Sequence, residues 1–245
     1  MKKIIGIILV TIWRIWFVLL AAIPILIMLP LLVIAVSFEK LFPLFYKMAR
    51  LWAHIIFFGM GFRVSKTIKQ KIARDKNYMF IANHSSMMDI MLMFILIKKP
   101  FLFVGKAELG KIPIFGFIYK RTAIMVDRKS PESRKAVFDE AQRRIQQGRS
   151  ICIFPEGGVP DRSVLLDKFK KGAFYMAIAH QLPIVPITFC DLKEKYPFDW
   201  FYGKPAKIKA TFHKHIEVKG LTKDDVPVVL EQSWNLIHEE LLNCK

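Results

Sequence analysis

The longest apolar run lies at the start of the chain. Residues 4–38 include one charged residue, Arg14, and two prolines, Pro24 and Pro30. As an unbroken helix this segment would extend about 52 Å, whereas the hydrocarbon core of a bilayer is about 30 Å thick. The segment is therefore predicted to bend or tilt. Basic residues on both sides favour two cytoplasmic ends, which predicts a hairpin turning near Pro24, either membrane-spanning or re-entrant.

A second apolar segment carries basic residues at helical spacing. Lys47, Arg50 and His54 recur among aliphatic and aromatic residues between positions 44 and 58. This pattern is typical of a helix lying in the membrane interface, although a buried core helix would carry the same apolar residues. Residues 1–62 are therefore predicted to form a membrane-anchoring hydrophobic hairpin and an interfacial helix. Residues 63–245 are predicted to form a separate catalytic domain.

From Asn77 onward, short apolar runs alternate with segments of helical periodicity. Strands are expected at 78–82, 101–105, 123–126, 150–154 and 183–189, with one or two more between 206 and 218. Helices are expected at 87–97, 172–181 and 228–242, and a further helix begins with Ser130 as N-cap and stops at Gly148. The predicted fold class is α/β: a mixed sheet flanked by helices, with an N-terminal membrane-embedded helical hairpin.

The net positive charge favours polyanionic partners but does not select one class of them. Lys and Arg number 38 against 20 Asp and Glu, a net charge of +18, and the hydrophobic fraction is 53%. Such a chain suits any polyanion, including nucleic acid, an anionic bilayer or a phosphorylated substrate. Nucleic-acid binding predicts basic residues interleaved with aromatics on one platform, or a known docking motif, and neither is present. The lipid bilayer is therefore the predicted partner, and nucleic acid is not.

The cysteines and histidines indicate no metal. Cys152, Cys190 and Cys244 are odd in number and widely spaced, so neither a disulfide framework nor a zinc site is predicted, and a reducing cytosol is expected. His213 and His215 lack neighbouring ligands at metal-binding spacing and are interpreted as surface histidines. No metal and no bound cofactor are predicted.

The first candidate for chemistry is His84 with Asp89, five positions apart at a strand-to-helix junction. The carboxylate can reach back to one imidazole nitrogen and leave the other to take a proton from an alcohol. The alternative is that Asp89 only favours the helix dipole. The second candidate is the loop at 154–158, where Glu156 and two glycines follow a buried strand. Such a loop can approach a phosphate or an oxyanion, although a tight turn with an exposed glutamate is the alternative.

Taken together, four stretches resemble the glycerolipid acyltransferase family, which includes the 1-acylglycerol-3-phosphate acyltransferases. The run Asn-His-Ser-Ser-Met-Met-Asp at 83–89 is similar to the family's first block. Three further blocks are matched in order by residues 106–128, 154–157 and 182–187. The resemblance covers residues 77–189, and the joint pattern is more specific than any single block.

The resemblance implies that His84 is a general base oriented by Asp89, and that the acceptor hydroxyl attacks an acyl thioester directly. The sequence agrees with direct attack, because it offers no nucleophile for an acyl-enzyme. No Gly-x-Ser-x-Gly elbow is present, and Cys152 lies in an apolar strand. The resemblance also implies that Glu156 and Gly157 help to form the acceptor site.

By the same resemblance, Lys106 and Arg128 are candidates to hold a phosphate, and their charge suits this role. The sequence departs from the family at two acceptor-binding positions. Val159 stands where the third block usually has an arginine, and Thr122 replaces a common glycine. Arg162 is the nearest replacement phosphate ligand, with the lysines of residues 168–171 as alternatives. Those lysines also suit a solvated or bilayer-facing patch.

The function that this resemblance implies is transfer of a fatty acyl group from acyl-CoA or acyl carrier protein to the free hydroxyl of lysophosphatidic acid. The product would be phosphatidic acid, made in phospholipid biosynthesis at an inner or cytoplasmic membrane, with the active site facing the cytoplasm. Acylation of another lysolipid, such as a lyso-aminolipid or a different lysophospholipid, is the alternative. A nonenzymatic basic membrane or nucleic-acid-binding protein is a third possibility, and loss of turnover in His84→Ala would exclude it.

Overall fold

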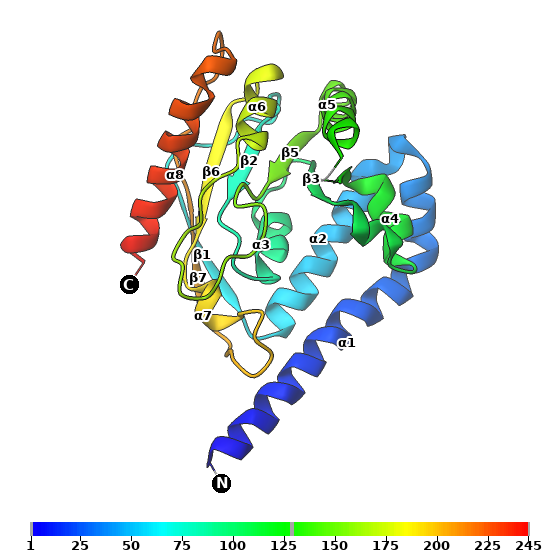
Figure 1. The fold of residues 1–245 in the computed structure, drawn as a ribbon. Helices are drawn as coiled ribbons and strands as arrows, with labels where there is room; N and C mark the ends of the chain where they lie inside the picture. Colours follow the sequence, from blue (N-terminus) through cyan, green and yellow to red (C-terminus); the bar gives the residue numbers. More distant parts are fainter. Residues whose placement is uncertain (1, 128–129, 245) are drawn as a thin grey trace.

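The computed structural model describes residues 2–127 and 130–244. Within them, seven strands form one sheet in the order β1-β7-β6-β2-β5-β3-β4 (Figure 1). The strands are β1 Arg63–Ile68, β2 Met79–Ala82, β3 Phe101–Lys106, β4 Ile124–Val126, β5 Ser150–Ile153, β6 Ile184–Phe189 and β7 Lys207–Phe212. Only β6 and β7 pair antiparallel among the described strands. The predicted mixed sheet is therefore confirmed.

Helices surround this sheet. They are α1 Lys2–Ser37, η1 Glu39–Leu41, α2 Phe42–Gly59, α3 Met88–Leu96, η2 Ala107–Lys111, α4 Phe115–Thr122, α5 Pro131–Gln146, α6 Gly172–Ala179, α7 Leu192–Lys195, η3 Lys223–Asp225 and α8 Val226–Leu242. α6 and α8 contact each other and the central strands β2 and β6, while α2 packs on α3. The core is thus built from the apolar faces of the sheet and its covering helices, as predicted for an α/β fold.

The N-terminal hairpin turns after α1, not within it. α1 continues through Pro24 and Pro30, and the chain reverses at η1. Three indole N–H groups then donate to carbonyls across the hairpin: Trp13 to Met60 (3.1 Å), Trp16 to Gly59 (3.0 Å) and Trp52 to Ala21 (2.9 Å). The predicted turn near Pro24 is wrong, because a proline in an apolar helix removes one hydrogen bond and kinks the helix without ending it. Figure 1 shows α1 changing direction between its dark-blue and lighter-blue parts.

α2 is a core helix along one face. Ala53 and Ile56 have no exposed surface, and Arg50 donates to the carbonyls of Phe94 (2.9 Å) and Ile95 (3.3 Å). These are carbonyls of the last turn of α3, which lack partners within their own helix. The predicted basic stripe therefore does not face the bilayer at Arg50, because that side chain caps a neighbouring helix.

Most other elements lie close to their predicted bounds. The N-cap prediction is confirmed for α5, where the Ser130 hydroxyl accepts from the Ser133 amide at 3.0 Å and Pro131 is the first helical residue. Sequence patterns missed β1 and α4. β1 is an edge strand whose side chains are mostly exposed, and α4 has only eight residues, so neither carries a strong periodic signal.

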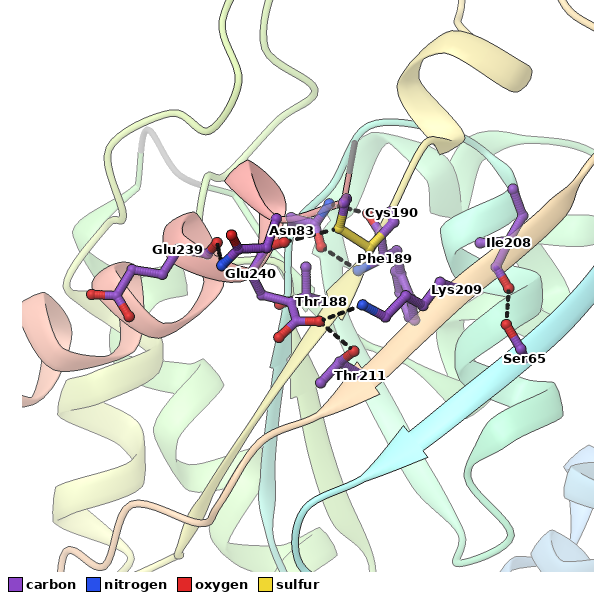
Figure 2. The surroundings of a disulfide bond; sticks show 12 residues. Ser65, Asn83, Thr188, Phe189, Cys190, Ile208, Lys209, Thr211, Glu239 and Glu240 are labelled. Carbon is purple, nitrogen blue, oxygen red and sulfur yellow. Dashed lines mark hydrogen bonds and ion pairs between the residues drawn. A yellow bond between two sulfur atoms is a disulfide. The ribbon is translucent and has the colours of Figure 1, made fainter.

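The C-terminal helix is fastened to the end of β6. Cys190 and Cys244 form a disulfide with a Cα–Cα distance of 5.7 Å (Figure 2). Next to it, Glu240 accepts from the Thr211 hydroxyl at 2.8 Å and pairs with Lys209 at 3.1 Å (Figure 2). The expectation of unpaired cysteines is wrong for this pair. α8 folds back across β6, so residues 54 positions apart meet without any spacing signal.

His213 is buried, contrary to prediction. Only 1% of the residue is exposed, and its Nε2 lies 2.8 Å from the Thr188 hydroxyl. Lys69 Nζ lies 3.5 Å from Nδ1. Burial lowers the pKa of His213 to about 4, and the Lys69 cation acts in the same direction. The chain continues to pair with β6 beyond the end of β7, through His213 N and Pro186 O at 3.0 Å, which keeps this side chain inside.

Candidate active site

The site lies where the central parallel strands end. β2 ends at Ala82, and the chain enters a short loop before α3. The Asn83 side chain starts this loop by donating to Phe189 O at 3.0 Å and accepting from Phe189 N at 2.8 Å. Asn83 thereby fixes the start of the loop to the end of β6. The carboxyl ends of parallel strands are the usual position of an α/β active site.

His84 and Asp89 lie in contact, as predicted. His84 Nδ1 is 3.0 Å from Asp89 Oδ2. The same oxygen accepts from the backbone amides of Ser85 (2.6 Å) and Ser86 (2.8 Å), and Asp89 has no exposed surface. With Nδ1–H directed at the carboxylate, Nε2 carries the free lone pair, and the His84 side chain remains 17% exposed. This is the geometry of a general base with its orienting carboxylate.

Two stacked aromatic rings pack against one face of the His84 imidazole. The His84 ring stacks on Phe154, with centroids 4.2 Å apart and planes 14° from parallel. Phe154 in turn stacks on Phe103 at 5.8 Å. The stack restricts rotation of the imidazole and excludes water from one of its faces. Sequence reasoning missed this role of Phe154, and its only signal was an aromatic residue directly after a buried strand.

Glu156 braces the His84 loop. One carboxylate oxygen accepts from the His84 amide at 2.6 Å, and the other accepts from the Asp167 amide at 2.9 Å. Only 4% of Glu156 is exposed. Burial raises the pKa of this carboxyl, and the two backbone hydrogen bonds oppose the rise. Glu156 therefore joins the His84 loop to the end of the loop at residues 157–167. Its contact with an acceptor remains a prediction.

Gly157 follows in a left-handed conformation with φ of +77°, and its amide donates to Phe154 O at 3.1 Å. A side chain at this tight turn would be strained. The structure thus brings His84, Asp89, Glu156 and Gly157 together around the ends of β2 and β5.

The predicted phosphate ligands are more dispersed. Lys106 is exposed at the end of β3. Arg162 is exposed on the loop after Gly157, with its guanidinium 5.0 Å from the centre of the Tyr202 ring. Arg128 lies outside the described residues. Among the described residues, neither Lys106 nor Arg162 forms a hydrogen bond with His84.

Lys193 is a cation of this region that sequence reasoning missed. From α7, its ammonium group donates to Asp161 O at 3.1 Å and to Val164 O. Burial lowers the pKa of Lys193, and the carboxylates of Glu156 and Asp161 oppose this effect. Lys193 therefore holds the loop at residues 157–167 in place. The sequence did not predict this contact, because Lys193 lies about 30 positions further along the chain. No group of three or more His, Cys, Asp or Glu side chains that could hold a metal ion occurs among the described residues.

The Acyltransferase family model matches residues 63–190, which include the His84–Asp89 pair and more than half of the chain, so the chain belongs to this family. It is similar to the 1-acyl-sn-glycerol-3-phosphate acyltransferase of Haemophilus influenzae, with 30% identity over 197 residues, 79% of this chain and 74% of that protein. It is 28% identical to the human 1-acyl-sn-glycerol-3-phosphate acyltransferase beta over 177 residues, 71% of this chain. That match spans 63% of the human protein, less than two thirds of its length.

A solved structure shares the fold. The crystal structure of the 1-acyl-sn-glycerophosphate (LPA) acyltransferase PlsC from Thermotoga maritima superposes with a TM-score of 0.78 and covers 98% of both chains. The two sequences are 23% identical. The similarity therefore includes the N-terminal helices as well as the sheet.

Proposed function

We propose that this chain is a 1-acyl-sn-glycerol-3-phosphate acyltransferase. It transfers a fatty acyl group from acyl-CoA or acyl carrier protein to the free hydroxyl of lysophosphatidic acid and produces phosphatidic acid. The 3.0 Å contact between His84 Nδ1 and Asp89 Oδ2 carries the proposal, because it leaves Nε2 to act as the base. The names of the relatives support the choice of acceptor.

In the proposed reaction, His84 Nε2 removes the proton of the acceptor hydroxyl as its oxygen attacks the thioester carbonyl. Asp89 stabilises the imidazolium that forms. The carbon–sulfur bond of the tetrahedral intermediate then breaks, and the departing thiolate takes the proton from His84. The ester remains on the acceptor, so His84 returns to its starting state without an acyl-enzyme. The reaction requires no metal or bound cofactor.

The phosphate of the acceptor requires cations near the strand ends. Lys106 and Arg128 are the proposed ligands, with Arg162 replacing the arginine missing at Val159. Glu156 and Gly157 shape the turn beneath this acceptor site. These proposed ligands determine which lysolipid is accepted, whereas His84 and Asp89 carry out the chemical step for any acceptor.

The membrane is the proposed location. Within the described residues, Ile4–Ser37 and Glu39–Gly59 are the helices long and apolar enough to cross a bilayer. Few residues of the first are buried in the isolated chain. Residues 1–62 are proposed as the membrane anchor and residues 63–245 as the catalytic domain. Basic residues on both sides of the apolar stretch support an active site on the cytoplasmic side.

The test is acyl transfer by the purified protein reconstituted in vesicles. Radiolabelled acyl-CoA or acyl carrier protein is offered with a panel of lysolipids. Wild type is expected to form phosphatidic acid, and His84→Ala to lose about 10²- to 10⁴-fold in rate. His54→Ala, on α2, is the matched control, because the His54 ring contacts only Arg50 O and Phe58 of its own helix among the described hydrogen bonds and ring pairs. Product from another lysolipid would reassign the acceptor, and activity that survives in His84→Ala would exclude the proposed base.

A further inference from the structure

Between α7 and β7 the chain forms a loop of exposed aromatic side chains. Phe198 is 54% exposed, Trp200 42%, Phe201 56% and Tyr202 53%. Aromatic residues of this size normally contribute to a core or an interface. Soluble proteins rarely expose apolar side chains as a contiguous group unless the group binds something. This aromatic loop, residues 197–203, therefore requires a partner.

The aromatic loop is held in shape at its base. The amide of Lys204 donates to Lys195 O at 2.9 Å and closes the loop. Gly203 has a φ of +130°, and a Cβ atom there would lie 2.8 Å from Lys195 O and 3.0 Å from the Trp13 ring. Only glycine permits this close approach to α1. The aromatic side chains are thus exposed on a fixed backbone.

Arg14 attaches the aromatic loop to α1. Its guanidinium donates to Pro197 O at 2.8 Å, to Asp199 O at 2.9 Å and to Tyr202 O, and it lies 3.9 Å from the centre of the Tyr196 ring. Arg14 is 4% exposed. A buried charge needs such partners, which gives a physical reason for the lone charge in the apolar stretch. The loop and the anchor helix therefore move as one unit.

The surroundings match a lipid surface in shape and in charge. Figure 1 shows the loop beneath α7 beside the dark-blue part of α1, where Ile15 is 50% and Trp16 45% exposed. Lys204 is exposed at the base of the loop, and Arg162 packs over the Tyr202 ring. Trp and Tyr concentrate where a bilayer meets water, and cations there bind anionic headgroups.

We propose that the aromatic loop is a second membrane-contact element, which enters the headgroup region of an anionic leaflet beside α1. Tyr196, the residue directly before the aromatic loop, contacts the loop that carries His84, because the Ser86 hydroxyl donates to Tyr196 O at 2.7 Å. If the proposed function holds, lipid contact at the aromatic loop keeps the site at the level of the leaflet from which a single-chain acceptor enters. The lipid contact itself does not depend on the reaction.

The first test measures depth in the bilayer. An environment-sensitive fluorophore is attached at Phe201→Cys, or at Val228→Cys on α8 as control, where Val228 is 68% exposed. Labelling is selective, because among the described cysteines the remaining thiol, Cys152, is buried. In phosphatidylcholine–phosphatidylglycerol vesicles, spin-labelled lipid is expected to quench the probe at position 201 and not the probe at 228. A probe at position 201 that is quenched no more than the probe at position 228 would overturn the proposal.

The second test uses the double variant Trp200→Ser/Phe201→Ser, with Val228→Ser as control. Both side chains are exposed, so the fold is expected to survive the change. Acylation of a vesicle-embedded lysolipid should fall by about 10-fold, while acylation in detergent micelles should stay unchanged. An equal effect in vesicles and micelles would show that the aromatic loop does not act through the bilayer. The quenching measurement remains decisive even if the reaction proves to be a different one.

Discussion

At the scale of single residues, one carboxylate oxygen of Asp89 accepts hydrogen bonds from three donors. Oδ2 receives His84 Nδ1 and the amides of Ser85 and Ser86. An amide side chain at position 89 could place its oxygen on the same three donors, but it carries no negative charge. It would therefore orient His84 without stabilising the imidazolium that forms when His84 takes a proton.

Asp89→Asn is therefore expected to lower kcat by about 10³- to 10⁴-fold with little change in KM. Steady-state acylation kinetics with the lysolipid that the vesicle assay identifies provide the measurement, and circular dichroism reports whether the fold survives. Asp191→Asn is the control, because Asp191 is exposed with a left-handed φ of 66° that Asn tolerates. A loss confined to KM would instead place Asp89 in substrate binding.

The sequence was informative where partners are close along the chain. The His84–Asp89 contact could be predicted because five positions at a strand-to-helix junction bring the two side chains together. The brace from Glu156 to the His84 amide could not, since these residues are 72 positions apart. They meet only because β2 and β5 pair in a particular register, which aligns Ile81 with Ile153. The Phe154 stack on the imidazole depends on the same register.

At the scale of elements, periodicity predicted the buried strands and the long helices well, and failed where tertiary contacts decide. The basic positions of α2 suggested a membrane stripe, yet Arg50 caps α3. Pro24 suggested a turn, yet α1 continues through it. Edge strand β1 lacks an apolar face, so its pairing with β7 was not visible in the sequence.

The disulfide between β6 and α8 gives a prediction at this scale. A bond that closes a segment of 54 residues is expected to stabilise the fold by about 2–4 kcal/mol, mainly by restricting the unfolded chain. Cys244→Ser should therefore lower the free energy of unfolding by this amount without reductant, and by much less with dithiothreitol. Denaturant titration with and without reductant measures the difference. Alkylation of three free thiols in the unfolded, unreduced protein would contradict the pairing.

At the scale of the whole molecule, the sheet has two parts with different roles. The candidate site lies at the carboxyl ends of β2 and β5. On the other side of β6, β7 and β1 form one edge of the sheet, and α8 packs on β6. His213 lies at the junction, between Thr188 of β6, Lys69 beyond β1 and, through Lys69, Glu240 of α8. Backbone hydrogen bonds extend the strand pairing here, from Lys69 N to Phe212 O at 2.9 Å and from His213 N to Pro186 O at 3.0 Å. The side chains around His213 add to these bonds in holding β7 and β1 against β6.

The pKa of His213 predicts acid sensitivity of the whole fold. Its folded-state value of about 4 lies below the ordinary 6.5, so the unfolded chain binds the proton first as pH falls. The stability due to neutral His213 is complete above pH 6.5 and is lost between pH 6.5 and 4, by at most about 3 kcal/mol. Denaturant titrations across this range should show the loss in wild type and a flatter profile in His213→Gln. Parallel profiles would place the acid sensitivity elsewhere. Glu240 has a pKa of about 2, because hydrogen bonds outweigh its burial, so the stability that it contributes is lost between pH 4.5 and 2, mostly below this window.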